Sequence, residues 1–360
     1  MPKEINVTKT YLANYEEYEK IFREIWESRN ITNNGKYLKL LEEKLKDKFV
    51  IDNAVCVSNG TIALQIAIEA VSDTRAVITT PFSYIATLNS ILWQKRNHLF
   101  VDINPITLNI DVKKLRTKLV EQKGNVGTIL VTHVYGQPCE VNSIAELAEE
   151  FGCKVIYDAA HCFNVKVNGR SIFEFGDISC TSFHATKIFH TVEGGSIFTK
   201  NHKIGNVVRR LRNFGHSDEN AFENVGINGK MSELHAAVGI VNLSHVDDRI
   251  KQSKEIFFAY HNILSQKYEV MRIEKNIDYN YSYFPILFKN YKDRETMIEK
   301  LKSQKIIPRR YFYPSLNLVF SQIGERMPVA ESAAERVLCI PMHADLEKDE
   351  QEKIIEILMS

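Results

Sequence analysis

The run Ser182-Phe183-His184-Ala185-Thr186-Lys187, followed by Glu193-Gly194-Gly195, is the most informative part of this chain. Upstream, Val155-Ile156-Tyr157 predicts a buried strand that ends on Asp158. The interval between Asp158 and Lys187 leaves room for one further strand, between Ile178 and Phe183. We therefore expect a carboxylate and an amine at the ends of neighbouring strands.

A carboxylate and a lysine in these positions suit pyridoxal phosphate. The lysine binds the aldehyde of the cofactor as a Schiff base, and the carboxylate keeps the pyridine nitrogen protonated. Either residue alone predicts little, because most lysines are solvated and an aspartate at a strand end commonly caps the next helix. The interpretation of Lys187 and Asp158 as a catalytic pair therefore needs a phosphate site and a residue that stacks on the ring.

A candidate phosphate site lies earlier in the chain. The strand-like run 54–57 leads into Ser58-Asn59-Gly60-Thr61 and then into a helical pattern. Such a turn leaves backbone N–H groups unpaired at the positive end of the helix dipole, and Gly60 lets a phosphate approach them. Asn59 and Thr61 can add side-chain hydrogen bonds. An ordinary helix cap has the same composition, and both interpretations stay open on this motif alone.

A candidate stacking residue follows the next predicted strand. Arg75–Thr80 is closed by Pro81, and Phe82-Ser83-Tyr84 leads into a second helical period. Tyr84 at this junction could stack on a planar ring, although a tyrosine is more often an ordinary core aromatic.

These motifs resemble the sugar-nucleotide aminotransferases of DegT/StrS type, within fold type I of the pyridoxal-phosphate enzymes. The likeness runs over nearly the whole chain. Its most specific stretches are Ser58-Asn59-Gly60-Thr61, His133-Val134-Tyr135-Gly136-Gln137-Pro138, Asp158-Ala159-Ala160-His161, Ser182 to Lys187 with Glu193-Gly194-Gly195, and Gly226 to Glu233.

The resemblance implies a role for each matching residue. Lys187 would be the Schiff-base lysine and Asp158 the partner of the pyridine nitrogen. Gly60, Thr61 and Ser182 would bind the phosphate, and Tyr84 would stack on the ring. Asn228 would reach the phosphate of the neighbouring subunit's cofactor, so that a homodimer would share its active sites.

Two features differ from the family pattern or extend it. His161 stands where many members have Gln, and its imidazole could donate to the cofactor's phenolic oxygen or stack on the ring. Arg309 and Arg310 precede Tyr311-Phe312-Tyr313-Pro314, which resembles a segment near the sugar-nucleotide site. We expect a substrate contact from Arg309 and Tyr313 there, against the alternative of a solvated face.

The order of the predicted elements indicates an α/β fold. Strand-like runs at 54–57, 76–80, 98–101, 128–132, 154–158, 178–183 and 196–199 alternate for the most part with helical stretches such as Val141–Phe151. This predicts a mainly parallel seven-stranded sheet with ligands at the carboxyl ends of the strands. From about His245 a long charged helix, Asp247 to Tyr268, begins a smaller lobe. We expect an N-terminal arm at 1–30, a large cofactor-binding domain at 31–244 and a small C-terminal α/β domain at 245–360.

Composition narrows the partners. Lys and Arg number 46 and Asp and Glu 45, and a net charge of +1 argues against nucleic acid. The six cysteines and the histidines show no metal-ligand spacing, so no metal is expected. Without a basic and apolar leader or a long apolar span, we expect a cytoplasmic protein and no membrane contact.

Several substrates remain open. The form Phe183-His184-Ala185-Thr186-Lys187 looks most like enzymes that transfer nitrogen from glutamate to dTDP-4-keto-6-deoxyglucose, giving dTDP-4-amino-4,6-dideoxyglucose. The alternatives are a 3-aminotransferase of a dTDP-3-keto-6-deoxyhexose and a 4-aminotransferase of a UDP- or GDP-sugar. A non-catalytic regulator that binds pyridoxal phosphate ranks far below, because the catalytic pair is intact. The pathway, whether O-antigen, antibiotic or glycan, is not visible in the residues.

Overall fold

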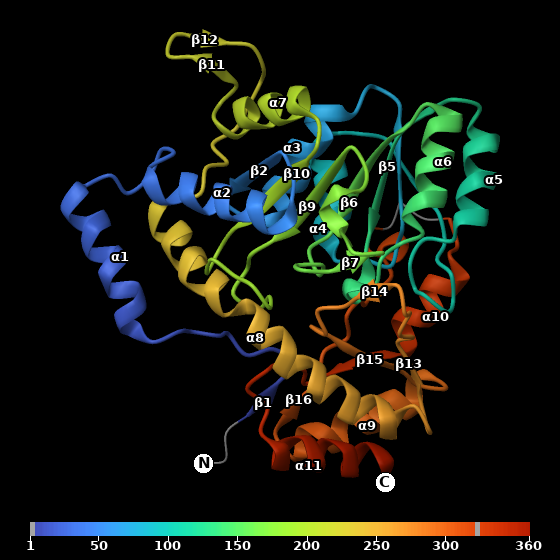
Figure 1. Cartoon of the computed structure of the whole chain (residues 1–360). Coiled ribbons are helices and arrows are strands. Elements are labelled where there is room, and N and C mark those ends of the chain that lie inside the picture. The colour runs from blue at the N-terminus through green and yellow to red at the C-terminus, as the bar shows by residue number, and fades with distance from the viewer. Residues whose placement is uncertain (1–3, 321–324) are drawn as a thin grey trace.

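The computed structural model describes residues 4–320 and 325–360, and a seven-stranded sheet forms the centre of its larger lobe (Figure 1). In spatial order the strands are β2 (Asn53–Val57), β10 (Gly195–Thr199), β9 (Ile178–Ser182), β6 (Lys154–Asp158), β5 (Val126–Thr132), β3 (Ala76–Thr79) and β4 (His98–Phe100). β10 runs antiparallel to β2 and β9, and every other neighbouring pair in this sheet is parallel. The predicted fold class, with its mainly parallel sheet, is confirmed.

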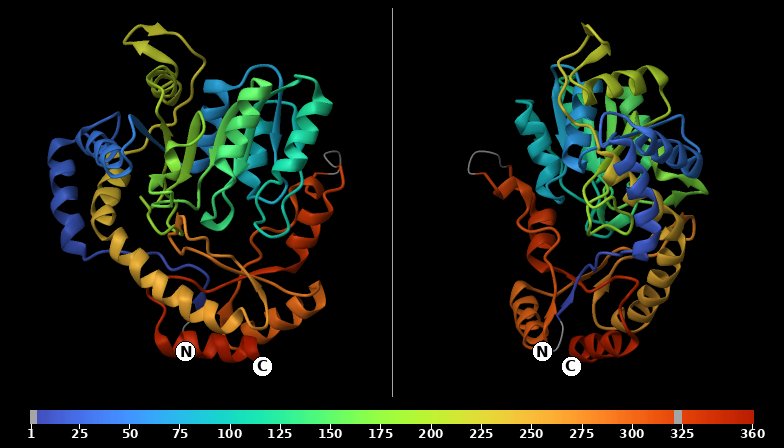
Figure 2. Two further views of the ribbon diagram at one scale, coloured as in Figure 1. Left: turned by 45° about the vertical axis from the view of Figure 1, so that its right-hand side comes forward. Right: turned by 90° about the vertical axis from the view of Figure 1, so that its left-hand side faces the viewer.

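Helices cover both faces of the sheet (Figure 2). Successive strand residues point to opposite faces, so Val55 and Val57 pack on one side while Ala54 and Cys56 pack on the other. The first side holds α3 (Gly60–Val71), α4 (Ile85–Trp93) and α7 (His202–Arg212). The second holds α2 (Lys36–Phe49), α5 (Val112–Gln122), α6 (Val141–Phe151) and the first half of α8 (Glu233–Leu264).

The smaller lobe is built around a three-stranded antiparallel sheet, β13-β15-β17. Its elements are β13 (Glu269–Val270), β15 (Phe284–Leu287), β17 (Val337–Ile340), α9 (Tyr291–Ser303), α10 (Pro328–Arg336) and α11 (Lys348–Met359). One hydrophobic core joins this lobe to residues of the large one, Phe82 and Tyr135 among them. The lobes therefore share buried surface along the line where the cleft lies.

Short strand pairs complete the fold. They are β1 (Ile5–Asn6) with β16 (Ile306–Ile307), β7 (Lys166–Val167) with β8 (Arg170–Ser171) and β14 (Ile277–Asp278), and the hairpin of β11 (His216–Asp218) and β12 (Ala221–Phe222). The pairing of β1 with β16 is parallel and attaches the start of the described chain to the small lobe. No helix in the described ranges has the length and apolar character needed to cross a membrane.

The long helix α8 connects the two lobes. We expected a helix to begin near Asp247, but α8 begins at Glu233, where the side chain of Ser232 accepts the N–H of His235. The N-terminal helix α1 (Tyr15–Ser28) packs on its first half, and the Tyr18 hydroxyl donates to Asn242 Oδ1 at 2.7 Å. The predicted boundary between residues 244 and 245 falls within α8, which is continuous there. The division into 1–30, 31–244 and 245–360 stays a prediction.

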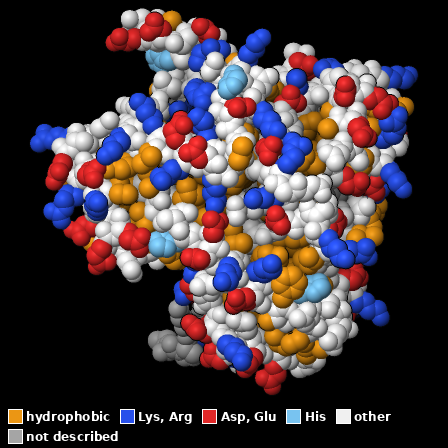
Figure 3. All heavy atoms as spheres, in the orientation of Figure 1, with side chains coloured by type: hydrophobic (Ala, Val, Ile, Leu, Met, Phe, Trp, Pro, Cys, Tyr) orange, Lys and Arg blue, Asp and Glu red, His pale blue; other side chains and the backbone are white. Residues whose placement is uncertain are grey.

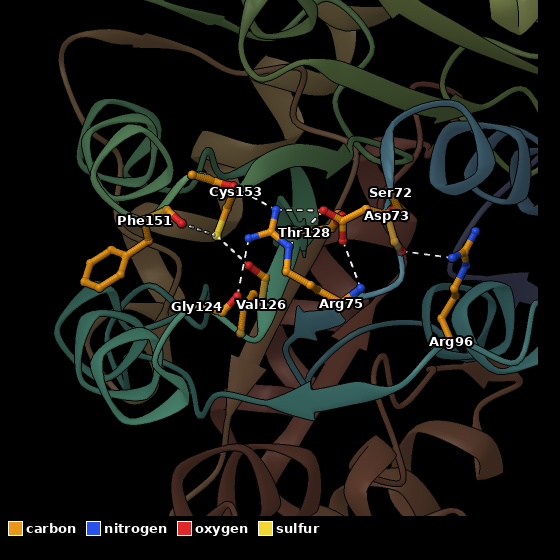
Figure 4. Close-up of polar contacts among 10 residues, drawn as sticks. Ser72, Asp73, Arg75, Arg96, Gly124, Val126, Thr128, Phe151 and Cys153 are labelled. Atoms are coloured by element: carbon orange, nitrogen blue, oxygen red, sulfur yellow. Dashed lines mark hydrogen bonds and ion pairs between the residues drawn. The ribbon is translucent and has the colours of Figure 1, made fainter.

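A polar cluster closes the amino-terminal edge of the central sheet (Figure 4). Arg75 Nε donates to Asp73 Oδ2 at 2.8 Å, and its terminal nitrogens donate to the carbonyls of Gly124 and Gly152. Arg96 donates to the carbonyl of Asp73 at 2.9 Å. These residues lie directly before β3, β4, β5 and β6, so one arginine fastens the starts of several strands.

Candidate active site

A cleft of about 1290 Å³ opens at the opposite, carboxyl-terminal edge of the sheet. It brings together nine of the predicted site residues, namely Asn59, Gly60, Thr61, Tyr84, Asp158, His161, Ser182, Lys187 and Arg309. Asp158 is the last residue of β6 and Ser182 the last of β9, so the parallel strands deliver both to the same edge. Asn228 and Tyr313 do not line the cleft.

Asp158 is buried, with 5% of its surface exposed. Its Oδ2 accepts from the Thr87 hydroxyl at 2.6 Å, and its Oδ1 accepts from the Ala160 N–H at 3.1 Å. Burial raises the pKa of Asp158, and this effect outweighs the opposing hydrogen bonds from Thr87 and Ala160 and the charge of Lys187. The carboxylate is thus oriented by neutral donors and has room for a cation as its partner.

Thr87 was not found from the sequence. It lies in the first turn of α4, three residues after Tyr84, and its hydroxyl is fully buried. It also contacts Ser83, whose hydroxyl is 2.7 Å from that of Thr132. A threonine in a first helical turn is common, so only the fold could reveal that it faces Asp158.

Lys187 lies in the loop between β9 and β10. Phe183 and Phe189 fix this loop, because both rings are buried and meet edge to face at 4.8 Å between centroids. The Lys187 N–H donates to the His184 carbonyl at 2.9 Å, which turns the side chain into the cleft. Burial lowers the pKa of Lys187 to about 8, so a substantial fraction of the amine is neutral near physiological pH.

The predicted phosphate-binding turn, Ser58 to Thr61, caps helix α3 and also lies in close contact with the end of β9. The Asn59 side chain accepts from the Ile62 N–H at 2.9 Å, so the capping interpretation holds for this residue. A Cβ on Gly60 would lie 2.9 Å from the Cβ of Ser182, so only glycine lets the start of α3 meet the end of β9 without a shift. The start of α3, with the backbone N–H groups of Gly60 and Thr61, therefore lies at the end of β9, where a phosphate can be bound.

His161 is a buried, neutral imidazole at the cleft wall. Its Nδ1 accepts from the Tyr135 N–H at 3.2 Å, which assigns the ring proton to Nε2. Burial holds the pKa of His161 well below its usual value. Its ring lies nearly parallel to those of Tyr135 and Phe312, at 6.5 and 5.6 Å between centroids. His161 can therefore offer a single hydrogen-bond donor on a rigid ring.

The remaining predicted residues lie at or beyond the mouth of the cleft. Tyr84 is 58% exposed in the lining, and Arg309 is exposed there as well. Tyr313 is turned against Arg310, whose guanidinium lies 3.2 Å from the ring centroid. Asn228 is exposed, and its Oδ1 accepts from Lys230 Nζ at 2.7 Å. The stacking role of Tyr84 and the substrate roles of Arg309 and Tyr313 stay predictions.

The cleft residues fit pyridoxal phosphate on three counts. Asp158 is a buried carboxylate that forms no ion pair with any residue the structure describes, so it is available to a pyridinium nitrogen. The junction of Gly60 with Ser182 offers a helix start at which a phosphate can be bound. Lys187 supplies an amine that is partly neutral and so can react with an aldehyde.

Comparison with known proteins agrees with this chemistry. The profile of the DegT/DnrJ/EryC1/StrS aminotransferase family matches residues 13–359. Relatives in Shigella dysenteriae and Escherichia coli are 37% and 36% identical, over 99% of this chain and 99% and 98% of theirs, and each is called dTDP-4-amino-4,6-dideoxy-D-glucose transaminase. The crystal structure of DesI in the presence of its TDP-sugar product superimposes with a TM-score of 0.93 at 25% identity, covering 99% of this chain and 93% of that one.

The fold and the site define an aminotransferase that uses pyridoxal 5′-phosphate. The chain belongs to the DegT/DnrJ/EryC1/StrS aminotransferase family, and the predicted family, enzyme class and cofactor are confirmed.

Proposed function

We propose that this enzyme transfers an amino group from glutamate to C4 of dTDP-4-keto-6-deoxyglucose, giving dTDP-4-amino-4,6-dideoxyglucose. The observation that carries the proposal is the 37% identity, over 99% of both chains, to a transaminase named for that product. The open cleft above Lys187 supports it, because about 1290 Å³ can hold a nucleotide sugar in addition to a cofactor.

Eight residues would bind the cofactor within one chain, and Tyr84 would stack on its ring. Asp158 would pair with the ring nitrogen, Lys187 would bind the aldehyde in the resting enzyme, and His161 would donate through Nε2–H. The other four are Asn59, Gly60, Thr61 and Ser182 at the phosphate. Bound there, pyridoxal phosphate supplies an electron sink that makes a carbon–hydrogen bond beside nitrogen acidic.

Lys187 would act as the general base and acid. Its amine, free once the amino donor has replaced it, would remove the proton from the α-carbon of glutamate. In the second half of the cycle the same amine would deliver a proton to C4 of the sugar. The lowered pKa of Lys187, about 8, suits both tasks near neutral pH. Asp158, oriented by Thr87, would hold the ring nitrogen of the cofactor in its charged form.

We also propose a homodimer in which Asn228 serves the neighbouring site. Asn228 is exposed and outside the cleft of its own chain, although it stands in one of the most family-specific stretches. Hydrophobic side chains gather over α1, α2 and the start of α8 in the surface view (Figure 3). Tyr15 and Trp26 on α1 are 67% and 76% exposed, and a second copy would cover them.

We propose a cytoplasmic enzyme of deoxyamino-sugar biosynthesis, such as that of O-antigen. All six cysteines are buried free thiols, which a reducing compartment maintains. Glutamate and nucleotide-linked sugars, and no nucleic acid or membrane, would be its partners.

A substrate panel tests the proposal. Holoenzyme with glutamate is offered dTDP-, UDP- and GDP-linked keto sugars with the keto group at C3 or C4, and the products are identified by mass spectrometry and NMR. The preference should be sharp, because a misplacement of about 1 Å at the reacting carbon can cost ~10²-fold in rate. We expect nitrogen on C4, equatorial, in the dTDP sugar. Nitrogen on C3 would overturn the proposed substrate, and an axial amine on C4 would overturn the named sugar.

A further inference from the structure

One hydrogen bond joins the two lobes at the reacting amine. Lys187 Nζ donates to the Tyr283 hydroxyl oxygen at 3.1 Å. Among the residues that the structure describes, this oxygen is the one hydrogen-bond partner of the amine. Nζ lies 5.7 Å from the centroid of the tyrosine ring, at the hydroxyl end. Tyr283 directly precedes β15 and thus belongs to the small lobe, whereas Lys187 follows β9 in the large one.

The Tyr283 ring has little freedom. Only 4% of its surface is exposed. The rings of His161, Tyr311 and Tyr135 surround it, at 4.4, 6.0 and 6.1 Å between centroids. Packing on several sides fixes the ring, so the position of its oxygen is set before any ligand enters.

The backbone that carries Tyr283 is hydrogen-bonded to the segment that follows β6 and Asp158. Asn280, only 1% exposed, donates from Nδ2 to the carbonyls of His161 and Phe163 at 2.8 and 2.9 Å. Its Oδ1 accepts from the Ser282 N–H at 3.2 Å. Both carbonyls lie just after Asp158 in the chain. These hydrogen bonds therefore fix the position of the Tyr283 hydroxyl relative to the Asp158 carboxylate.

We propose that Tyr283 is a positioning residue for Lys187: its hydroxyl holds Nζ at the cleft wall whenever the amine is free. This rests on the proposed function, in which the free amine moves the proton. A lysine side chain is flexible and has many rotamers, so one fixed acceptor restricts the positions of its amine. Donating one N–H to the tyrosine oxygen leaves the lone pair of the neutral amine directed elsewhere, toward the cleft.

The same bond has a measurable electrostatic consequence. An ammonium donates a stronger hydrogen bond than a neutral amine, so the hydroxyl favours the charged form of Lys187. Removing the hydroxyl should therefore lower the pKa of Lys187 further. A tyrosine that only filled space would leave the pKa unchanged when replaced by phenylalanine.

The test measures this pKa on the apoenzyme. Competitive acetylation of Lys187 is followed across pH by mass spectrometry in wild type, Tyr283→Phe and the matched control Tyr281→Phe. Tyr281 is a buried neighbour that packs on Phe257 and does not line the cleft. We expect wild type to titrate at about pH 8. Tyr283→Phe should titrate roughly 0.5–1 unit lower, and Tyr281→Phe should match wild type.

A second measurement uses the holoenzyme. In a single turnover with glutamate, Tyr283→Phe should react roughly 10-fold more slowly with little change in the half-saturating glutamate concentration, because orientation and not binding is lost. Should Tyr283→Phe fail to fold, Tyr283→Trp keeps an aromatic body but offers no acceptor oxygen, and its Lys187 pKa should also fall.

Two outcomes would overturn the role of Tyr283: a wild-type Lys187 pKa in the variants without the hydroxyl, or an equal shift in Tyr281→Phe. A wild-type enzyme that transaminates no sugar nucleotide would refute the proposed function instead, and the acetylation result would stand apart from it.

Discussion

One aspartate lies at the amino-terminal end of the strands of the central sheet and another at their carboxyl-terminal end, and their surroundings differ. At the amino-terminal edge Asp73 is half exposed and forms an ion pair of 2.7 Å with Arg75. The hydrogen bond from Arg75 holds the pKa of Asp73 below its usual range. At the carboxyl-terminal edge Asp158 is buried, has two neutral donors, and its pKa is raised by burial.

The difference separates structural charges from functional ones. Asp73 finds its counter-ion within the chain, and its loss would affect only the folding equilibrium. Asp158 is desolvated and has no ion-pair partner among the described residues, which opposes folding of the apoenzyme and leaves the carboxylate for a ligand. The same contrast applies to the cations. Arg75 donates to a carboxylate and two carbonyls, whereas Lys187 Nζ donates to one neutral oxygen among the described residues.

The largest effect is expected at Lys187. Lys187→Ala should reduce transamination by roughly 10⁴-fold or more, because it removes both the covalent attachment and the proton carrier. Arg75→Ala, at the other edge, should stay within a few-fold of wild type. Turnover with glutamate and the visible absorption of lysine-bound cofactor measure both variants. Normal turnover in Lys187→Ala would remove the mechanism.

Asp158→Asn should come next. An amide cannot hold the ring nitrogen charged, so kcat should fall by roughly 10²–10³-fold while some cofactor is retained. Asp73→Asn is the matched control and should keep wild-type kcat. Equal rates in Asp158→Asn and wild type would show that Asp158 is no more functional than Asp73.

A mixing experiment extends the comparison to residues outside the cleft. If Asn228→Ala is impaired, it is mixed with inactive Lys187→Ala after subunit exchange. With shared sites, about half of the dimers are hybrids with one intact site of two, so about a quarter of wild-type activity should return. No recovery despite proven exchange would mean that Asn228 serves its own subunit.

The smallest effect concerns apoenzyme stability. The pKa of Asp158 in the folded apoenzyme is raised above its unfolded value, which is near 3.9. The free energy of unfolding therefore falls as pH rises from about 3.9 to the folded-state pKa, and the whole destabilisation is present at higher pH. At neutral pH Asp158→Asn should therefore raise Tm by roughly a few degrees, and the gain should fade toward pH 4. Asp73→Asn should lower Tm slightly, since solvent screens an exposed pair. Differential scanning calorimetry across pH measures both changes in Tm. A lower Tm in Asp158→Asn at neutral pH would contradict the prediction.

Much of this architecture could be predicted from the sequence. Buried parallel strands form continuous apolar runs, so all seven strands were located near their observed ends. The helix Val141–Phe151 was predicted with both ends correct, because Gly152 ends it in a left-handed conformation with φ of 64°. Helix α8 was started too late, since its first half is apolar on the side that packs in the large lobe and lacks the charged pattern of the second.

The missing site residues share one cause. Thr87 and Tyr283 act through partners 71 and 96 residues away in the chain, and nothing in their local sequence marks them. Asp158 and Lys187 were found because a family-like motif surrounds each of them. The role of Asn228 depends on a second copy of the chain and stays a prediction.

The continuous helix α8 also sets the angle between the lobes. Its 32 residues extend over roughly 48 Å, with Val246 packed in the large lobe and Phe257 in the small one. A single residue inserted between them would advance the helix by about 1.5 Å and turn everything after it by about 100°. Tyr283 would then be carried away from Lys187. A chimera spliced within α8 must therefore preserve the residue count of this helix, whatever the similarity of the donor lobes.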